Sequence, residues 1–454
     1  MAVTGSQSAG DVAASLPLLG TTDPARVVAW RDGVPVPAAR FLAHVEAVAA
    51  RLPAARHVIN LCEDRYAFLV AFCAALTRGQ ANLLPPSRAP QAVAEVMRAH
   101  PGCYTVGDTA LPMTPPGHVR LPALGDGAVD AAPPVPRIDA RQVAAIGYTS
   151  GSTGRPQASV KTWASYVAST AGNLGMLRAH LDEPFHVLAT VPPQHMYGME
   201  MSVLLPLLAA VGVHAGRPLL PADVAHALAQ LPAPRVLVTT PVHLRALVGS
   251  GQALAPLAAM VSATAPMPEA LARAAEARFG APLLEVFGST ETCVFAGRRS
   301  ARETAWTPYP GVTLEPRPDG TCVHAPQLAA PVTLADIMAL DDAGRFRLVG
   351  RQGDQLEMAG KRASLADLNQ RLLAIEGVRD GVIFQLDTAD RLGVRRLAAL
   401  VVAPDVDEAA IMAALRRSVD PVFLPRPVRK VAALPRNATG KLPRAALLAM
   451  LEPG

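Results

Sequence analysis

The sequence predicts an α/β protein, with layered and mostly parallel sheets covered by helices, followed by a small α+β C-terminal domain. Between about residues 35 and 290, short apolar runs typical of strands alternate with longer segments that carry apolar residues at helical spacing. After residue 300 short turn-rich segments replace this alternation. The 454 residues exceed what one hydrophobic core usually organises, so two or three domains are expected.

The first expected helix covers residues 37–53, where these apolar residues recur at helical spacing: Phe41, Leu42, Val45, Val48 and Leu52. The strand "HVINLC" follows it, and "DRYAFLVAFCAALTRG" is expected to be a helix that Asp64 caps and Gly79 ends. The further strand candidates are "AAIGY", "HVLATV", "RVLVTT", "AAMVSA" and "PLLEVF". Most of them precede a helical pattern, which favours parallel strands with helical connections.

The C-terminal domain is expected at residues 351–454 and the N-terminal domain, with a trimmed β-subdomain near its end, at 1–350. Ser364 with an acid three residues later, Asp367, is close to a capping box at the start of a helix. The elements predicted for this domain are a helix near 364–376, strands near 378–385 and 394–403, and a helix near 407–418.

Composition favours a cytoplasmic enzyme or binding protein. Half of the residues are apolar and the net charge is only +5, which argues against disorder and against a dedicated nucleic-acid binder. Five cysteines without a C-x-x-C pair suggest free thiols in a reducing compartment. The N-terminus does not have the pattern of a signal peptide, and the longest apolar stretch, Met201–Val213, is too short to span a bilayer.

The stretch "YTSGSTGRPQ", residues 148–157, can fold around phosphate oxygens, because glycine allows unusual backbone angles while hydroxyls and amides donate hydrogen bonds. A plain surface loop is the alternative. The stretch lacks the Gly-Lys of a Walker A loop, and "GYTSG" has threonine where a nucleophile elbow needs serine. The predicted phosphate-binding residues are Thr149, Ser150, Gly151, Ser152, Thr153 and Gly154.

This stretch resembles the phosphate-binding signature of the adenylate-forming superfamily, which includes acyl-CoA synthetases, aryl-acid ligases and peptide-synthetase adenylation domains. Four further segments resemble other signatures of that superfamily and occur in the same order: "PPQHMYGME", "SATAPMP", "EVFGSTET" and "PRNATGKLPR". The resemblance covers nearly the whole chain. It implies an ATP-dependent ligase in which a carboxylate attacks the α-phosphate, pyrophosphate leaves, and a thiol then displaces AMP from the acyl-adenylate.

Two of these segments would form the acid pocket. By the resemblance His195 walls the carboxylate site, although a lone histidine beside Met and Tyr is also typical of a packed core. The "SATAPMP" segment would run between the acyl pocket and the adenine, where small residues are needed. The expected pocket residues are His195, Met196, Tyr197, Gly198, Met199, Ala263, Thr264 and Ala265.

The nucleotide side would come from "EVFGSTET" and two later residues. Phe287 and Gly288 would lie near the adenine, Thr290 would hold phosphate, and Glu291 would bind Mg²⁺, a cation that prefers oxygen ligands. A Ser-Thr-Glu turn that only caps a helix is the alternative. Asp336 and Arg351, fifteen residues apart, would contact the ribose, or for Arg351 a phosphate; the Thr-Gly usually before the aspartate is missing, and a surface acid is the alternative.

The last signature gives the catalytic lysine, Lys441, which would bridge the carboxylate and the α-phosphate. A solvated basic tail is the alternative. In the superfamily the C-terminal domain rotates between the two half-reactions, and the hinge position corresponds here to Gly353 in place of an acid or lysine. Gln157 also replaces the usual lysine at the end of the phosphate loop.

Size and "EMAGKR" give a narrower likeness to compact ligases of aryl polyene and xanthomonadin-type pigment clusters, which load hydroxybenzoic or related aryl acids onto acyl carrier protein. The expected cofactors are ATP and Mg²⁺. The expected partners are a small carboxylic acid and a phosphopantetheine thiol of a carrier protein or CoA, with no nucleic acid and no membrane span. Three alternatives remain: a fatty or short-chain acyl-CoA synthetase, a degenerate nucleotide-binding homologue, and an α/β-hydrolase using Ser289 or Ser152 with His195.

Overall fold

The structure is a computed structural model, and it describes residues 14–451 with nine gaps. The gaps are residues 112, 126, 128–131, 150–156, 319, 352–354, 359–360, 390–394 and 438–439. The side chains of residues 149, 157, 351, 355, 357, 361, 362, 388 and 389 are also not described.

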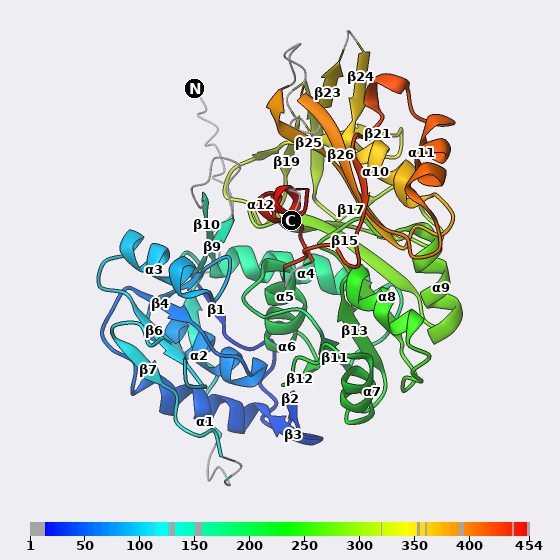
Figure 1. The fold of residues 1–454 in the computed structure, drawn as a ribbon. Coiled ribbons are helices and arrows are strands. Elements are labelled where there is room, and N and C mark those ends of the chain that lie inside the picture. Colours follow the sequence, from blue (N-terminus) through cyan, green and yellow to red (C-terminus); the bar gives the residue numbers. More distant parts are fainter. Residues whose placement is uncertain are drawn as a thin grey trace, which may run out of the picture.

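Two sheets form the frame of the N-terminal domain (Figure 1). The six-stranded sheet has the order β10-β9-β5-β4-β6-β7: β4 (His57–Asn60), β5 (Ala81–Leu84), β6 (Tyr104–Gly107), β7 (His118–Arg120), β9 (Val143–Thr149), β10 (Gln157–Thr162). The nine-stranded sheet has the order β17-β16-β15-β14-β13-β11-β12-β2-β3: β2 (Val27–Arg31), β3 (Val34–Pro37), β11 (Phe185–Ala189), β12 (Val211–His214), β13 (Arg235–Thr239), β14 (Ala259–Ser262), β15 (Leu283–Ser289), β16 (Cys293–Arg299), β17 (Thr307–Pro308).

The central strands of both sheets are parallel, as the sequence predicts. The edge strand β7 is parallel to β6 as well, and the other edges pair antiparallel. The antiparallel neighbours are β9–β10, β2–β3, β15–β16 and β16–β17. All six quoted strand candidates contain a strand, namely β4, β9, β11, β13, β14 and β15. Since β9–β10 and β15–β16 carry two of the quoted motifs, the motifs lie where the parallel order ends.

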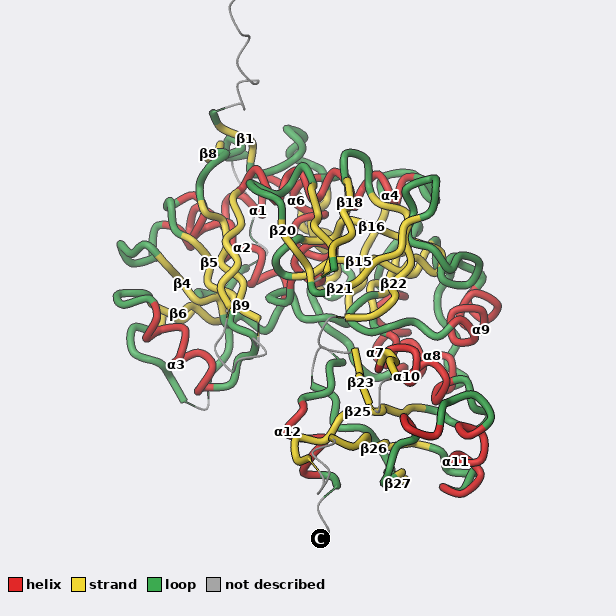
Figure 2. Tube along the Cα trace, turned by 90° about the horizontal axis from the view of Figure 1, so that it is seen from above, coloured by secondary structure: helices red, strands yellow, loops and turns green. Residues whose placement is uncertain are grey.

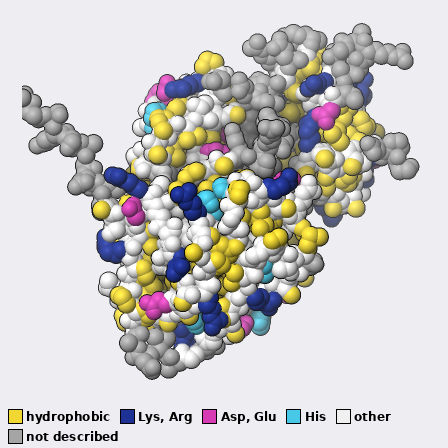
Figure 3. Space-filling view, turned by 90° about the vertical axis from the view of Figure 1, so that its left-hand side faces the viewer, with side chains coloured by type: hydrophobic (Ala, Val, Ile, Leu, Met, Phe, Trp, Pro, Cys, Tyr) yellow, Lys and Arg dark blue, Asp and Glu magenta, His cyan; other side chains and the backbone are white. Residues whose placement is uncertain are grey.

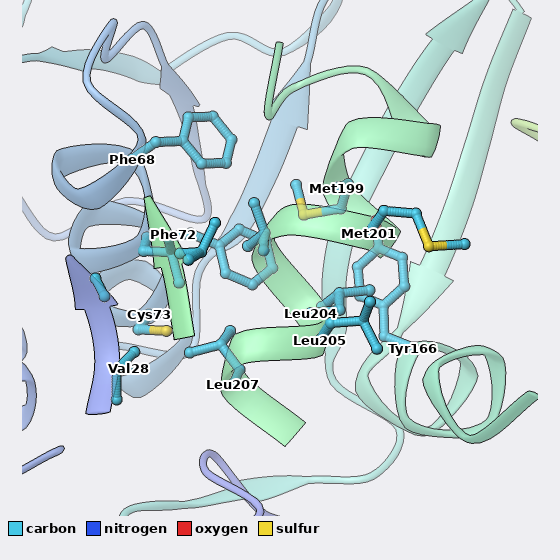
Figure 4. Close-up of a cluster of buried hydrophobic side chains, with 14 of the residues drawn as sticks. Val28, Phe68, Phe72, Cys73, Tyr166, Met199, Met201, Leu204, Leu205 and Leu207 are labelled. Carbon is cyan, nitrogen blue, oxygen red and sulfur yellow. The ribbon is translucent and has the colours of Figure 1, made fainter. Parts of the chain in front are cut away.

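Helices cover the sheets and enclose the main core. They are α1 (Ala38–Ala49), α2 (Arg65–Thr77), α3 (Pro90–Ala99), α4 (Trp163–Arg178), α5 (Met196–Met199), a π-helix η1 (Glu200–Leu204), α6 (Leu205–Leu208), α7 (Pro221–Ala229), α8 (Pro241–Gly249) and α9 (Glu269–Phe279). Figure 4 shows apolar side chains of α2 facing those of the α5–η1–α6 run, with Tyr166 of α4 on its other side. This contact joins the layers under the candidate site.

Local signals explain why these helices begin where they do. The Asp64 carboxylate accepts a hydrogen bond from the Ala67 amide, 2.8 Å away, and Gly79 beyond the helix has φ +70°, so the predicted cap and stop of α2 are both confirmed. The predicted capping box at Ser364 is wrong in its second half. Ser364 caps through the Ala366 amide, but Asp367 pairs with Arg371 instead of reaching back to Ser364.

Three small sheets follow or flank the N-terminal frame. They contain β1 (Ser15–Pro17) with β8 (Arg137–Asp139), β18 (Thr313–Arg317) with β19 (Gly320–His324) and β20 (Val332–Leu334), and β21 (Asp336–Leu340) with β22 (Phe346–Arg351). The last two sheets lie where the sequence predicts a trimmed β-subdomain.

The C-terminal domain has a hairpin, a three-stranded sheet and helices, packed around two hydrophobic clusters of its own. Its elements are β23 (Gln355–Met358), β24 (Lys361–Ser364), α10 (Leu365–Leu373), β25 (Asp380–Ala389), β26 (Arg395–Val402), α11 (Glu408–Arg416), a 3₁₀ turn η3 (Pro421–Phe423), β27 (Val428–Lys430) and α12 (Arg444–Ala449). Figure 2 shows them as a separate body beside the N-terminal domain. The predicted boundary between residues 350 and 351 stays a prediction, and the hinge residue Gly353 lies outside the described residues.

The described residues include no helix that is both long and apolar enough to cross a membrane. On the face in Figure 3, Lys and Arg side chains are dispersed among apolar and polar ones instead of forming one continuous basic surface.

Candidate active site

The stretch Ser150–Gly154 lies outside the described residues, so its phosphate-binding role stays a prediction. The strands on either side of it are described. Thr149 at the end of β9 pairs with Gln157 at the start of β10, and the two strands are antiparallel. The stretch therefore connects two hydrogen-bonded strands at one edge of the six-stranded sheet.

A tight turn between β15 and β16 carries the next motif. The Ser289 amide donates to Thr292 Oγ1 at 3.0 Å and the Thr292 amide donates to Ser289 Oγ at 3.2 Å, which closes the turn. A Cβ at Gly288 would lie only 2.1 Å from the Cys293 carbonyl oxygen, so this position has no room for a side chain. Thr290 and Glu291 consequently lie at the tip of the turn.

Two side chains of β10 hold this tip by its backbone. Ser159 Oγ donates to the Thr290 carbonyl at 3.1 Å, and Lys161 Nζ donates to the Glu291 carbonyl. Residues two apart in a strand point to the same face, which explains why both reach the same turn. The strand that leaves the predicted phosphate loop is thus bonded directly to the turn with the predicted Mg²⁺ ligand.

A buried carboxylate lies behind the same turn. Glu200, in the π-helix, accepts hydrogen bonds from the Val294 amide at 3.0 Å, from Asn173 Nδ2 at 3.0 Å, and from the Ser169 hydroxyl. Burial raises the pKa of Glu200, while these hydrogen bonds and nearby Lys161 act in the opposite direction. Glu200 is fully buried, so it supports the turn and does not contact solvent.

Sequence reasoning missed Ser159, Lys161 and Glu200. Ser159 and Lys161 are two residues apart on the strand that follows the predicted phosphate loop. This spacing places both side chains on one face of the strand and could have indicated a shared role. Glu200 stands out as an acid inside the apolar run "YGMEMSVLL", where a buried charge needs partners.

His195, predicted to line the pocket for the carboxylic acid, directly precedes α5. Its Nδ1 atom is buried and has no hydrogen-bond partner among the described residues. Burial, and then the nearby charge of Lys441, lower the pKa of His195 to about 4, so the imidazole is neutral at pH 7. A neutral ring with an open nitrogen can border a carboxylate pocket without adding charge to it.

The four residues after His195 divide into two groups. Met196 lies close to the nucleotide motifs, since a Cβ on Gly147 would be 3.5 Å from Met196 Cε and 2.8 Å from Thr290 Cγ2. The Tyr197 hydroxyl is 2.9 Å from the Val261 carbonyl oxygen, and Met199 lies in the main core (Figure 4). A Cβ at Gly198 would be 2.0 Å from the Pro192 carbonyl oxygen. Tyr197 and Met199 therefore already pack against the protein interior, and they would line the acid pocket in addition to these contacts.

Ala263, Thr264 and Ala265 follow the end of β14. Thr264 has φ +80°, a left-handed conformation that is rare for a β-branched residue and that glycine adopts without strain. Its Oγ1 atom is buried and has no hydrogen-bond partner among the described residues. The segment thus carries a polar atom next to strained backbone.

Phe287, Asp336 and Arg351 are placed by the neighbouring β-structure. Phe287 is partly buried in an aromatic cluster, with ring centroids 5.2 Å from Trp306 and 5.5 Å from Phe295. Asp336 on β21 is the direct register partner of Arg351 on β22, so the two predicted ribose-contacting residues are adjacent. Asp336 is 9% exposed, which does not fit the alternative of a surface acid.

Lys441 and the residue before it lie close to the predicted acid pocket. Lys441 is exposed, and it is near enough to His195 to lower the pKa of that side chain. Gly440 before it has φ +79° and is buried, and a Cβ there would lie 3.7 Å from Thr264 Oγ1 and 3.9 Å from Val242 Cγ2. The loop that carries Lys441 therefore rests on the N-terminal domain beside the acid side of the site.

A family model for AMP-binding enzymes matches residues 43–353, which include His195, the turn at Glu291, and the strand pair of Asp336. The chain belongs to the AMP-binding enzyme family. The predicted fold is confirmed. The predicted enzyme class, an AMP-forming acid–thiol ligase, is confirmed as well. Membership also weakens the hydrolase alternative, and Ser289 is bonded to Thr292 in the turn.

Relatives of this AMP-binding enzyme include a 4-coumarate–CoA ligase of Rhodobacter capsulatus, 33% identical over 65% of this chain and 74% of the relative. A probable 2-succinylbenzoate–CoA ligase of Mycobacterium tuberculosis is 29% identical over 67% of this chain and 84% of its own. Among solved structures, o-succinylbenzoate CoA synthetase of Bacillus subtilis with its acyl-adenylate has a TM-score of 0.78 at 16% identity, over 94% of this chain and 96% of that one. This last likeness supports the fold alone.

Proposed function

We propose that this AMP-binding enzyme activates an aryl carboxylic acid, such as a hydroxybenzoate, with ATP and transfers the acyl group to a phosphopantetheine thiol. The observation that carries the proposal is the contact between the loop of Lys441 and the predicted acid pocket: a Cβ on Gly440 would lie 3.7 Å from Thr264 Oγ1, which brings the predicted catalytic lysine to that pocket. The named substrates of two similar ligases, 4-coumarate and 2-succinylbenzoate, support an acid with a ring.

The first half-reaction brings an anionic carboxylate to a polyanion, so its barrier is largely electrostatic repulsion. In this proposal Lys441 binds the carboxylate and α-phosphate oxygens and offsets their charge as the new bond forms. The neutral His195 ring borders the acid, and the Ser/Thr/Gly stretch at 150–154 holds the pyrophosphate part. Each group contributes by positioning and charge, as in other phosphoryl-type transfers.

Mg²⁺ fits the turn at Glu291. The carboxylate is a hard oxygen ligand, it is only partly buried, and its backbone is held by Lys161. When bound, the ion would neutralise phosphate charge. Glu291 would hold it, and Thr290 beside it would contact phosphate.

The thiol acceptor would be an acyl carrier protein or CoA. The five free cysteines agree with a reducing, cytoplasmic setting. Phe287, Asp336 and Arg351 are proposed to contact the adenosine, and Gly353 is proposed as the hinge of a rotation between the half-reactions.

Hydroxylamine trapping of the acyl-adenylate tests the proposal across three panels: benzoates, cinnamates and fatty acids. Activity that is highest with one hydroxylated aryl acid is expected. The preferred acid is then offered with CoA and with a phosphopantetheinylated carrier protein, and the thioester is detected by mass. Preference for alkyl acids would contradict the aryl substrate, and no ATP-dependent product with any acid would favour the degenerate homologue.

A further inference from the structure

The C-terminal loop with Lys441 is braced by an arginine of its own. Arg436 Nη1 donates to the carbonyl of Gly440, the residue before Lys441, at 2.8 Å. Asn437 closes the same loop, because its amide donates to the Lys441 carbonyl and its side-chain oxygen accepts from the Lys441 amide, both at 2.9 Å. The backbone on either side of the lysine is therefore fixed by residues 436 and 437.

Arg436 is itself held by a carboxylate. Its Nη2 lies 2.8 Å from Asp380 Oδ1 and its Nε lies 3.1 Å from Asp380 Oδ2, a two-point pair in which both side chains are less than a fifth exposed. Such a fork fixes the plane of the guanidinium as well as its position. Asp380 opens β25, so the brace is anchored on the sheet of the C-terminal domain.

The same carboxylate faces a second arginine across the domain boundary. Arg245 on α8 of the N-terminal domain has Nη1 3.8 Å from Asp380 Oδ2. Figures 1 and 2 both show α8 on the side of the N-terminal domain next to the C-terminal domain. Burial lowers the pKa of Arg245, and the charge of Asp380 opposes that effect. Val242, one turn earlier on α8, is a neighbour of Gly440.

We propose that Arg245, Asp380 and Arg436 are positioning residues for adenylation: the ion pair across the boundary docks the C-terminal domain and, through the Arg436 fork, sets the backbone that presents Lys441. The inference rests on the proposed function. None of the three side chains needs to touch substrate. Rotation of the C-terminal domain would separate Arg245 from Asp380, while the Asp380–Arg436 fork, which lies within one domain, would travel intact.

The test compares Asp380→Asn, Arg436→Gln and Arg245→Gln with the control Arg379→Gln. Arg379 is next to Asp380 in sequence, but it pairs with Asp405 on the surface, where both side chains are more than half exposed. Adenylation is read as ATP–pyrophosphate exchange with 4-coumarate and with 4-hydroxybenzoate. Thiol transfer is read separately, from synthetic 4-coumaroyl adenylate to CoA.

A displaced lysine lowers kcat for exchange by about 10- to 100-fold in the Asp380 and Arg436 variants. Arg245→Gln removes the partly exposed ion pair with Asp380 and lowers kcat for exchange roughly fivefold. The KM for ATP and the thiol transfer rate stay within twofold of the wild type, and Asp380→Glu restores part of the exchange rate. Equal losses in both half-reactions, or losses no larger than in Arg379→Gln, would overturn the proposal.

Hydrogen exchange at the Gly440 and Lys441 amides of the free enzyme gives a readout independent of any acid. Protection of these amides is expected to fall in Arg436→Gln and to stay unchanged in Arg379→Gln, with equal melting temperatures. If the wild type converts no acid, the proposed function fails, and this measurement still decides whether the brace exists. Unchanged protection in Arg436→Gln would show that it does not.

Discussion

The two halves of the site are supported in different ways. The half from the N-terminal domain, the turn at Glu291, is held in part by a fully buried carboxylate and a nearly fully buried lysine, since Glu200 is 0% and Lys161 3% exposed. The half from the C-terminal domain, the loop at Lys441, is held by groups that remain partly exposed, with Arg245 at 32%. Buried hydrogen-bonded charges are costly to separate, whereas partly exposed pairs are cheap to break and remake.

This difference suits a site with one permanent and one removable half. In the proposed function, the turn at Glu291 holds the nucleotide through both half-reactions, and the loop at Lys441 acts only in the first. The predictions below separate the two kinds of support, from the largest effect to the smallest.

Removing the buried carboxylate should damage the permanent half most. Glu200→Ala leaves the Val294 amide, Asn173 and the Ser169 hydroxyl without their acceptor and removes the negative charge near Lys161. Loss of one member of a buried charged network typically costs about 3–5 kcal/mol. The measurement is urea unfolding of the N-terminal domain. Glu200→Ala combined with Lys161→Met should cost less than the sum of the single changes, because no charge is then left unpaired. If Glu200→Ala lowers the free energy of unfolding by less than about 1 kcal/mol, as for an exposed ion pair, the two halves of the site do not differ in their support.

Removing the lysine should affect rate and leave stability alone. Lys441→Ala is expected to reduce ATP–pyrophosphate exchange by about 10²- to 10³-fold, the usual effect of losing one charge-stabilising donor. ATP binding, followed by calorimetry, should change little. Lys430→Ala in the same domain is the matched control, since that exposed lysine bonds only the Pro404 carbonyl among the contacts described for its Nζ. Exchange at the wild-type rate in Lys441→Ala would refute the role of the lysine.

The neutral histidine predicts a pH dependence. Because the pKa of His195 is lowered to about 4 in the folded state, the unfolded state binds an extra proton between that value and its ordinary pKa near 6.5. The free energy of unfolding should therefore fall as pH drops from about 6.5 to about 4, by up to about 1.4 kcal/mol per pH unit from this residue.

The comparison of wild type with His195→Gln isolates this contribution, since other histidines also have lowered pKa values. The difference in unfolding free energy should change across that pH window and be flat above pH 7. A difference that is flat throughout would mean that His195 titrates normally.

The smallest effect concerns backbone strain beside the loop of Lys441. Thr264→Gly relieves a left-handed conformation and should stabilise the N-terminal domain by up to about 1 kcal/mol. Ala263→Gly, at a neighbour without positive φ, should instead destabilise by about 0.5–1 kcal/mol. The melting temperatures of both variants test this prediction. Destabilisation by Thr264→Gly would show that the contacts of the threonine side chain outweigh its backbone strain.

Much of the fold could be predicted because its signals are local. The cap at Asp64 and the alternation of strands and helices depend on neighbouring residues, so the sequence predicts both and the structure confirms them. The order of motifs also predicts roles for Glu291, His195 and Lys441, which stay predictions. Support for these residues comes from far along the chain, from Lys161 to Glu291 and from Glu200 to Val294, and periodicity in one segment cannot reveal such pairs. Likewise, the Asp367 carboxylate pairs with Arg371, four residues later on the same helix. This ion pair competes with the capping box that the sequence predicts.

The position of Arg245 has a consequence for protein engineering. A hybrid enzyme that joins this N-terminal domain to the C-terminal domain of another ligase would place a different residue opposite Arg245. That domain would have to supply an acid in the place of Asp380 together with a fork like that of Arg436, or the hybrid would fold and bind nucleotide while its lysine was misaligned.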